Sequence, residues 1–135
     1  MIQRIQSIWL LLAGASALAS LKFSFYSGSK ANGVFEELNN ATGFLLLFLT
    51  VAVALTAFIT IFLFKNRKLQ MQLTWIGLFL QIAGIAVLIS KTNDYTQGNY
   101  SLTALFAFVV PLLFLLAWSG IRKDEKLIKS MDRLR

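Results

Sequence analysis

Three long stretches without charge restrict this chain more than any other feature of its sequence. Residues 43–64, 73–90 and 102–121 contain no Asp, Glu, Lys or Arg. A bilayer core about 30 Å thick requires roughly 17–25 residues of helix, so each stretch is long enough to cross a membrane. Overall, 57% of the residues are hydrophobic and 14% are charged, whereas soluble domains carry about 25% charged residues. The sequence therefore predicts an integral membrane protein.

Helices are the expected form of these three stretches. Inside lipid, every backbone donor and acceptor needs a partner within the protein, which leaves only helices and closed barrels. The strands of membrane barrels alternate apolar and polar residues over about ten positions. A run such as "FLLLFLTVAVALTAFITIFLF" does not alternate, so helices are predicted.

The N-terminal segment "MIQRIQSIWLLLAGASALAS" allows two interpretations. It resembles a signal peptide, because Ala17-Leu18-Ala19 provides an A-x-A-like cleavage site. It also resembles a first span, because apolar residues continue to Leu21 and residues 5–21 reach the lower length limit for crossing. In that case the small residues Ala13 and Ala17, four positions apart, would let another helix approach closely. We favour the retained span.

We therefore expect an all-α membrane protein, a four-transmembrane-helix bundle in one domain. The expected spans are residues 5–21, 43–64, 73–90 and 102–121, and residues 122–135 form a helical, amphipathic cytoplasmic tail. Between the first two spans we expect a turn at Asn32-Gly33 and a short helix around residues 34–38 at the membrane surface.

The distribution of basic residues predicts how the chain is oriented. With four spans, ten of the thirteen Lys and Arg residues fall on the side that holds both termini. The other side has only Lys22, Lys30 and Lys91. Because cytoplasmic loops carry an excess of Lys and Arg, both termini are predicted to be cytoplasmic.

The aromatic residues are sorted in the same way. Trp9, Trp75 and Trp118 fall near the predicted cytoplasmic interface, and Tyr26, Tyr95 and Tyr100 cluster at the opposite face. Trp and Tyr side chains favour the headgroup regions, so this sorting agrees with the predicted spans.

One polar residue lies deep in a predicted span. Gln81 shares a helical stripe with Gly77 and Gly84, and Thr56 belongs to a similar small-residue stripe on the second span. Gln81 could coordinate a ligand, but we favour a hydrogen bond between helices, which contributes about 0.6 kcal/mol on average.

Pro111 suggests a partner for Gln81. A proline inside a helix cannot donate to the carbonyl four residues earlier and is expected to kink the helix. The carbonyl left without this bond is that of Ala107, and we expect the Gln81 amide to donate to it. The candidate intramembrane polar contact therefore comprises Gln81, Thr56 and Pro111.

The residue types that usually carry chemistry are scarce. The chain has no Cys and no His, which removes thiolate metal sites and the commonest catalytic base. The span centres hold no ionisable residue, which argues against a self-contained ion-coupled transporter. No paired carboxylates or nucleophile–base pair fall at one membrane depth. We therefore expect a non-enzymatic protein with no catalytic, cofactor-binding or metal-binding residue.

The C-terminal segment "IRKDEKLIKSMDRLR" is the strongest functional candidate. Leu127, Ile128, Met131 and Leu134 recur at helical spacing and predict an apolar stripe, while Glu125 and Lys129 can pair one turn apart. The segment could lie on anionic headgroups, at about 1 kcal/mol per basic residue, or it could dock onto a protein. Both interpretations remain open. Nucleic acid is not an expected partner, because orientation in the membrane already explains the positive charge.

The two ends of the chain resemble the opening and closing signatures of a known family. "MIQRIQSIWLLLA" and "IRKDEKLIKSMDRLR" are similar to those of short four-span proteins from Bacteroidota-type Gram-negative bacteria, catalogued as a domain of unknown function. The resemblance covers the whole chain and implies a retained first span and an inner-membrane location. It implies no activity.

We interpret the chain as an accessory or scaffold subunit of the inner membrane, with the bilayer and a membrane or cytoplasmic protein as partners. The alternative is a small homo-oligomeric transporter, or a membrane protein that binds lipid or a small molecule through the Gln81 and Pro111 region. The candidate docking residues are Gln3, Arg4, Lys123, Asp124, Glu125, Leu127, Ile128, Met131, Asp132, Arg133 and Arg135.

Overall fold

Four helices and a small sheet make up the computed structural model, which describes residues 5–41, 43–63 and 65–134. The helices are α1 (Ile5–Ala19), α2 (Phe44–Phe62), α3 (Arg67–Thr92) and α4 (Leu105–Arg133), with one 3-10 turn at Leu102–Ala104. The strands are β1 (Tyr26–Lys30), β2 (Phe35–Leu38) and β3 (Tyr95–Tyr100).

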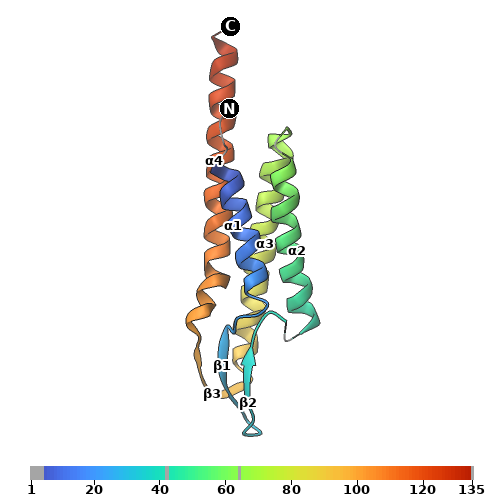
Figure 1. The fold of residues 1–135 in the computed structure, drawn as a ribbon, viewed down its shortest axis with the longest axis vertical. Coiled ribbons are helices and arrows are strands. Elements are labelled where there is room, and N and C mark those ends of the chain that lie inside the picture. Colours follow the sequence, from blue (N-terminus) through green and yellow to red (C-terminus); the bar gives the residue numbers. More distant parts are fainter. Residues whose placement is uncertain (1–4, 42, 64, 135) are drawn as a thin grey trace.

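The four helices lie side by side and alternate in direction (Figure 1). α1 packs against α2 and α4, and α3 also packs against α2 and α4, so the helices form a ring. We call the end with the strands the sheet end. The opposite end, where α1 begins and α4 finishes, is the tail end.

Three helical segments are long and apolar enough to cross a membrane: Phe44–Phe62, Arg67–Thr92 and Leu102–Arg133. They agree with the three uncharged stretches of the sequence, but the last two extend into polar sequence at their tail ends. α1 is apolar but has 15 residues and ends at Ala19, before the predicted end of the first span at Leu21. At 1.5 Å per residue it is about 22 Å long, which is shorter than a bilayer core of about 30 Å.

The predicted small residues of α1 are buried against the other helices. Ala13 and Ala17 belong to the main hydrophobic cluster, which α2, α3 and α4 complete. On α3, a Cβ on Gly77 would lie 2.7 Å from the ring of Phe114, so this glycine admits a large buried side chain of α4. Gly84 differs, since a Cβ there would meet no described atom within 4 Å. Gly84, on the same stripe as Gly77 and Gln81, therefore does not admit a close neighbour among the described residues.

The all-α prediction is wrong for the connections between helices. They form a three-stranded antiparallel sheet in the order β2-β1-β3, and residues 34–38 contribute a strand rather than the expected helix. Pairing explains the difference: Tyr26 on β1 faces Leu38 on β2 and also Tyr100 on β3. A short helix would leave most of its backbone N–H and C=O groups without hydrogen-bond partners. In the sheet, β1 instead pairs its backbone groups with β2 on one edge and with β3 on the other.

The predicted turn at Asn32-Gly33 is confirmed, and it explains the hairpin. The Gly33 N–H donates to the Lys30 carbonyl over 2.9 Å, and the Lys30 N–H donates to the Val34 carbonyl over 3.1 Å. Gly33 has a φ of 79°, a left-handed conformation that glycine adopts without a steric penalty. A three-residue loop with glycine in this position is a common way to close a hairpin.

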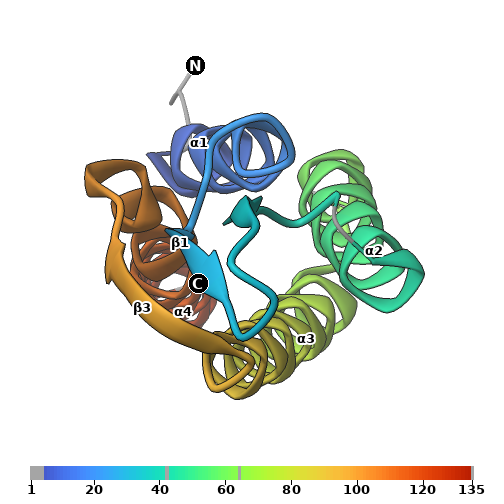
Figure 2. The same ribbon diagram turned by 90° about the horizontal axis from the view of Figure 1, so that it is seen from below.

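The sheet covers one end of the helix ring (Figures 1 and 2). Phe25 and Leu38 pack there with Leu46 of α2, Leu88 of α3 and Ala107 of α4. The predicted tyrosine cluster is confirmed: the ring of Tyr26 lies 5.2 Å from that of Tyr95 and 5.1 Å from that of Tyr100.

Candidate functional site: the tail end of the molecule

The most prominent feature of the tail end is the length of α4. The predicted fourth span and the predicted tail form one uninterrupted helix, Leu105–Arg133. Figure 1 shows this helix running past the ends of α1, α2 and α3. The expectation of a helical tail is confirmed for residues 122–133, and Leu134 follows as the C-cap. We refer to residues 122–134 below as the tail.

The tail begins at a polar contact with α1. The Gln6 side chain of α1, which is buried, donates from Nε2 to Oδ2 of Asp124 over 2.8 Å. One turn earlier on α4, a Cβ on Gly120 would lie 3.2 Å from Cβ of Gln6, so the two helices are close here. Asp124 therefore helps to join α1 to α4, in addition to any role in docking.

Three sides of the tail carry different residues. Gly120, Asp124, Leu127, Met131 and Leu134 follow one another at spacings of four, three, four and three residues, and so share one side of the helix. Because the first two contact Gln6, this side points toward α1. The last three lie beyond the beginning of α1 and are 60%, 66% and 88% exposed. We call Leu127, Met131 and Leu134 the tail stripe.

The side of the tail above α3 carries charges of both signs. Trp118 marks this side, because its ring lies 5.6 Å from that of Trp75 on α3 and the Arg122 guanidinium lies over it. Glu125 and Asp132 follow on this side at helical spacing. Lys129 pairs with Glu125 over 3.2 Å, one turn apart, which confirms the predicted ion pair.

The third side of the tail continues the face of α4 that carries the exposed residues Leu112 and Leu116. At 100° per residue, Lys123, Lys126 and Arg133 fall on this side, and all three are exposed. The tail therefore presents an apolar side, a side with charges of both signs and a basic side.

The structure brings together most of the predicted docking residues. Lys123, Asp124, Glu125, Leu127, Ile128, Met131, Asp132 and Arg133 all lie on this helix. Gln3, Arg4 and Arg135 lie outside the described residues. Gln6 was missed, because a single Gln near a helix start is equally consistent with a solvent-facing position.

The predicted contact between Gln81 and Ala107 is confirmed. Gln81 is buried on α3, and its Nε2 donates to the Ala107 carbonyl of α4 over 2.9 Å. This carbonyl lies four residues before Pro111, whose ring nitrogen has no proton to donate. The Gln81 amide thus closes the gap that the proline leaves in the α4 hydrogen-bond ladder.

The predicted intramembrane polar contact also included Thr56, but the Thr56 hydroxyl bonds within its own helix, α2. It donates to the Ala52 carbonyl over 2.7 Å. A polar contact between α2 and α3 comes instead from Gln70, whose Nε2 donates to the Thr60 carbonyl over 3.0 Å. Gln70 is buried; it lies in a polar run of the sequence and gave no signal of burial.

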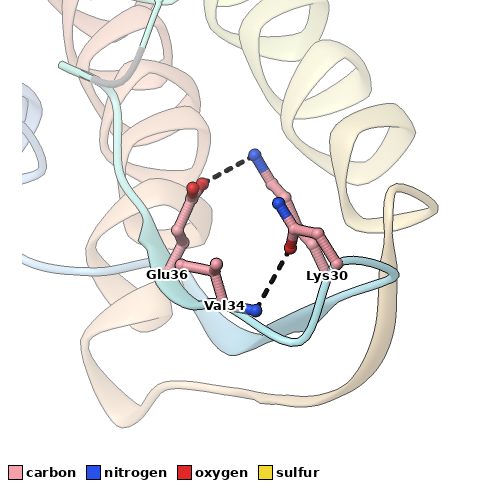
Figure 3. Close-up of polar contacts among 4 residues, drawn as sticks. Lys30, Val34 and Glu36 are labelled. Carbon is pink, nitrogen blue, oxygen red and sulfur yellow. Dashed lines mark hydrogen bonds and ion pairs between the residues drawn. The ribbon is translucent and has the colours of Figure 1, made fainter.

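Polar residues at the sheet end stabilise the hairpin. Lys30 Nζ lies 2.6 Å from Glu36 Oε2, and the Val34 N–H donates to Oδ1 of Asn32 over 3.1 Å (Figure 3). The hydrogen bond to Glu36 raises the pKa of Lys30, and partial burial raises the pKa of Tyr95. Among the described residues, no three His, Cys, Asp or Glu side chains gather as they would around a metal ion.

The fold and its contacts define a class. A mostly helical chain with three helices long and apolar enough to cross a bilayer is a membrane protein.

Comparison with known proteins then identifies the family. Residues 2–134 match the family described as "Domain of unknown function (DUF4293)", and the chain belongs to that family. The match includes both ends of the chain, which carry the signatures noted in the sequence. Neither the curated proteins nor the solved structures contain a significant match.

Proposed function

We propose that this protein is a non-enzymatic accessory or scaffold subunit of the bacterial inner membrane, which holds a partner protein through its tail. In this proposal all four helices cross the membrane, α1 is retained, and both termini are cytoplasmic. The observation that carries the proposal is that α4 continues as one helix beyond the other three and exposes the tail stripe.

The continuity of α4 favours a protein partner over the lipid surface. Met131 lies ten residues and Leu134 thirteen residues beyond Ile121, which at 1.5 Å per residue places them about 15–20 Å further along the helix. The headgroup region extends only about 5–8 Å beyond each side of the hydrocarbon core. Pro111 lies before Ile121 and no proline follows it in α4, so this part of the helix carries Met131 and Leu134 past the headgroups.

The buried contacts argue against a ligand site at Gln81. The side-chain donor that could bind a solute already binds the Ala107 carbonyl. Releasing it would leave a buried backbone acceptor unpaired, at a cost of roughly 1–3 kcal/mol. We therefore favour docking over transport.

The orientation of the chain can be tested with reporter fusions. A fluorescent protein and an alkaline phosphatase would each be fused to the C-terminus and, separately, within the β1–β2 hairpin at Gly33. Fluorescence at the C-terminus and phosphatase activity at the hairpin are expected. The reverse pattern would contradict the proposed orientation.

The docking role can be tested by affinity purification from native membranes in mild detergent. Met131→Glu should lose a stoichiometric partner that the natural chain retains, because the charge would be desolvated in the contact. Lys126→Glu, on the basic side, is the matched control and should reduce capture less. Recovery of the natural chain as a homo-oligomer without any partner would contradict the proposal.

A further inference from the structure

An aromatic surface lies between α3 and α4 near the tail end, on the outside of the helix ring. The ring of Trp75 lies 5.6 Å from that of Trp118 across the two helices and 5.8 Å from that of Phe79 along α3. Trp75 and Phe79 are exposed, so this surface faces outward, where a membrane protein contacts lipid. We call Trp75, Phe79 and Trp118 the aromatic seam.

Two cations lie at the end of the aromatic seam that is closer to the tail. Cζ of Arg122 lies 5.2 Å from the centre of the Trp118 ring, so the guanidinium stacks on the seam. Lys68 lies seven residues before Trp75 and therefore on the same side of α3. Both cations are exposed.

The two cations also lie at the same height along the bundle. α3 and α4 run in opposite directions (Figure 1), and Gly77 of one packs against Phe114 of the other. Lys68 is nine residues before Gly77, and Arg122 is eight residues after Phe114. At 1.5 Å per residue, both lie about 12–14 Å from that contact, toward the tail end. One ligand can therefore reach both.

Depth and chemistry indicate what that ligand is. Lys68 and Arg122 are the first charged residues beyond the tail ends of the uncharged stretches 73–90 and 102–121, which places them at the level of the lipid headgroups. Within the described part of the chain, neither has a carboxylate partner. A guanidinium stacked on an aromatic ring keeps its N–H edge free, and that edge matches the geometry of a phosphate.

The charge of the site favours an anionic headgroup over a zwitterionic one. Glu125 lies three residues after Arg122 on the α3 side, but its Oε1 lies 3.2 Å from Nζ of Lys129. This pair is neutral, so the charges of Lys68 and Arg122 stay uncompensated. A zwitterionic headgroup would bring an ammonium group beside these two cations, whereas an anionic headgroup would not.

We infer that Lys68 and Arg122 bind the phosphate of an anionic phospholipid, whose glycerol and upper acyl chains rest on the aromatic seam. Basic sites between transmembrane helices bind anionic headgroups in this way. The inference goes beyond the proposed docking function, because the lipid site lies at the base of the tail and does not involve the tail stripe. A lipid held there would join α3 to α4 at the level where α4 leaves the other helices.

Quenching of tryptophan fluorescence by brominated lipid tests the inference. The full chain would carry Trp9→Phe, which leaves Trp75 and Trp118 as the reporters. It would be reconstituted in vesicles that mix phosphatidylethanolamine with phosphatidylglycerol, with bromine on the acyl chains of one of the two lipids. The test variant carries Lys68→Gln and Arg122→Gln.

The matched control carries Lys123→Gln and Lys126→Gln, which remove the same charge from the basic side of the tail. All four substituted residues are exposed, so the fold should be retained. We expect brominated phosphatidylglycerol to quench several-fold more strongly than brominated phosphatidylethanolamine at the same mole fraction. The test variant should lose this preference, and the control should keep it.

Three other outcomes would overturn the inference. Equal quenching by the two lipids would show that the aromatic seam is an ordinary interfacial belt. Loss of the preference in the control as well would show a general attraction to positive charge rather than a site. Relief of the quenching by millimolar inorganic phosphate would identify a soluble anion as the ligand. None of these outcomes bears on partner docking, which affinity purification measures separately.

Discussion

The two ends of this molecule differ in structure: a sheet covers one end of the helix ring, and a single helix extends from the other. At the sheet end, three strands from two separate connections pair across the helix ring and bury Phe25 and Leu38 among the helix ends. At the tail end, α4 leaves the other helices and exposes the tail stripe. At the first end the strands pair their backbone groups across the helix ring, although Phe35 and Leu102 there are also exposed, whereas at the second end a single helix extends beyond the other three. This difference is the main reason to seek function at the tail end.

Substitution of Gly28 should have the largest effect and would break the sheet end. A Cβ on Gly28 would lie 2.1 Å from the Gln97 carbonyl oxygen and 2.5 Å from Cα of Gly98, its partner on β3. Because these are backbone atoms, Gly28→Ala must separate β1 from β3, and we expect a loss above the roughly 1–3 kcal/mol of ordinary overpacking. Thermal unfolding in detergent would measure it.

Gly84→Ala is the matched control for this substitution. The added methyl group would meet no described atom within 4 Å. Replacing a helical glycine by alanine is favourable by roughly 0.5–1 kcal/mol. A similar loss of stability in both variants would contradict the close pairing of β1 with β3.

Loss of the Gln6 amide should have the next largest effect and would test how firmly the tail end is joined. Gln6→Leu removes the donor to the Asp124 carboxylate, and hydrogen bonds to charged groups contribute about 1.5–3 kcal/mol. We expect lower stability together with weaker partner capture, because the base of the tail would move relative to α1. An unchanged unfolding temperature would show that the hydrogen bond between Gln6 and Asp124 does not stabilise the packing of α1 against α4.

Gln81→Leu, in the part of the helix ring that lies between the two ends, should reduce stability by a smaller amount. It leaves the Ala107 carbonyl without its donor, at a cost of roughly 1–3 kcal/mol. In a Pro111→Ala background, the restored N–H at position 111 can donate to the same carbonyl. The effect of Gln81→Leu should then become smaller, and a double-mutant cycle measures the coupling. Equal effects in both backgrounds would contradict the link between Gln81 and Pro111.

The pH dependence of the Lys30–Glu36 ion pair should be the smallest effect. The hydrogen bond to Glu36 raises the pKa of Lys30 above its usual 10.5. A raised pKa in the folded protein means that the stabilisation is complete below pH 10.5 and is lost as the pH rises through the folded value. The unfolding temperature should therefore fall slightly more above pH 10.5 in the natural chain than in Glu36→Gln. Identical profiles would show that the pair adds nothing to the sheet end.

The sequence predicts the helices well because length and apolar character decide which segments can cross a membrane. It also predicts the Gln81–Ala107 contact, because a proline in a helix identifies the carbonyl that lacks a donor. The sheet was missed for a different reason. Tyr26 and Tyr100 are paired although α2 and α3 lie between them in the sequence, and no local pattern in either segment indicates such a pairing. The buried positions of Gln6 and Gln70 depend on which helices are neighbours, which hydropathy alone does not determine.

The strand order also determines when each part of the sheet can form during synthesis. β1 can pair with β2 as soon as the hairpin emerges, since only Ala31, Asn32, Gly33 and Val34 separate them. β3 follows only after α2 and α3 have been made, because Tyr100 lies 74 residues after its partner Tyr26. At about 5–20 residues per second, that interval is roughly 4–15 s. During this interval the edge of β1 that later binds β3 is open, so the sheet end must be completed late, by the same segment that leads into α4.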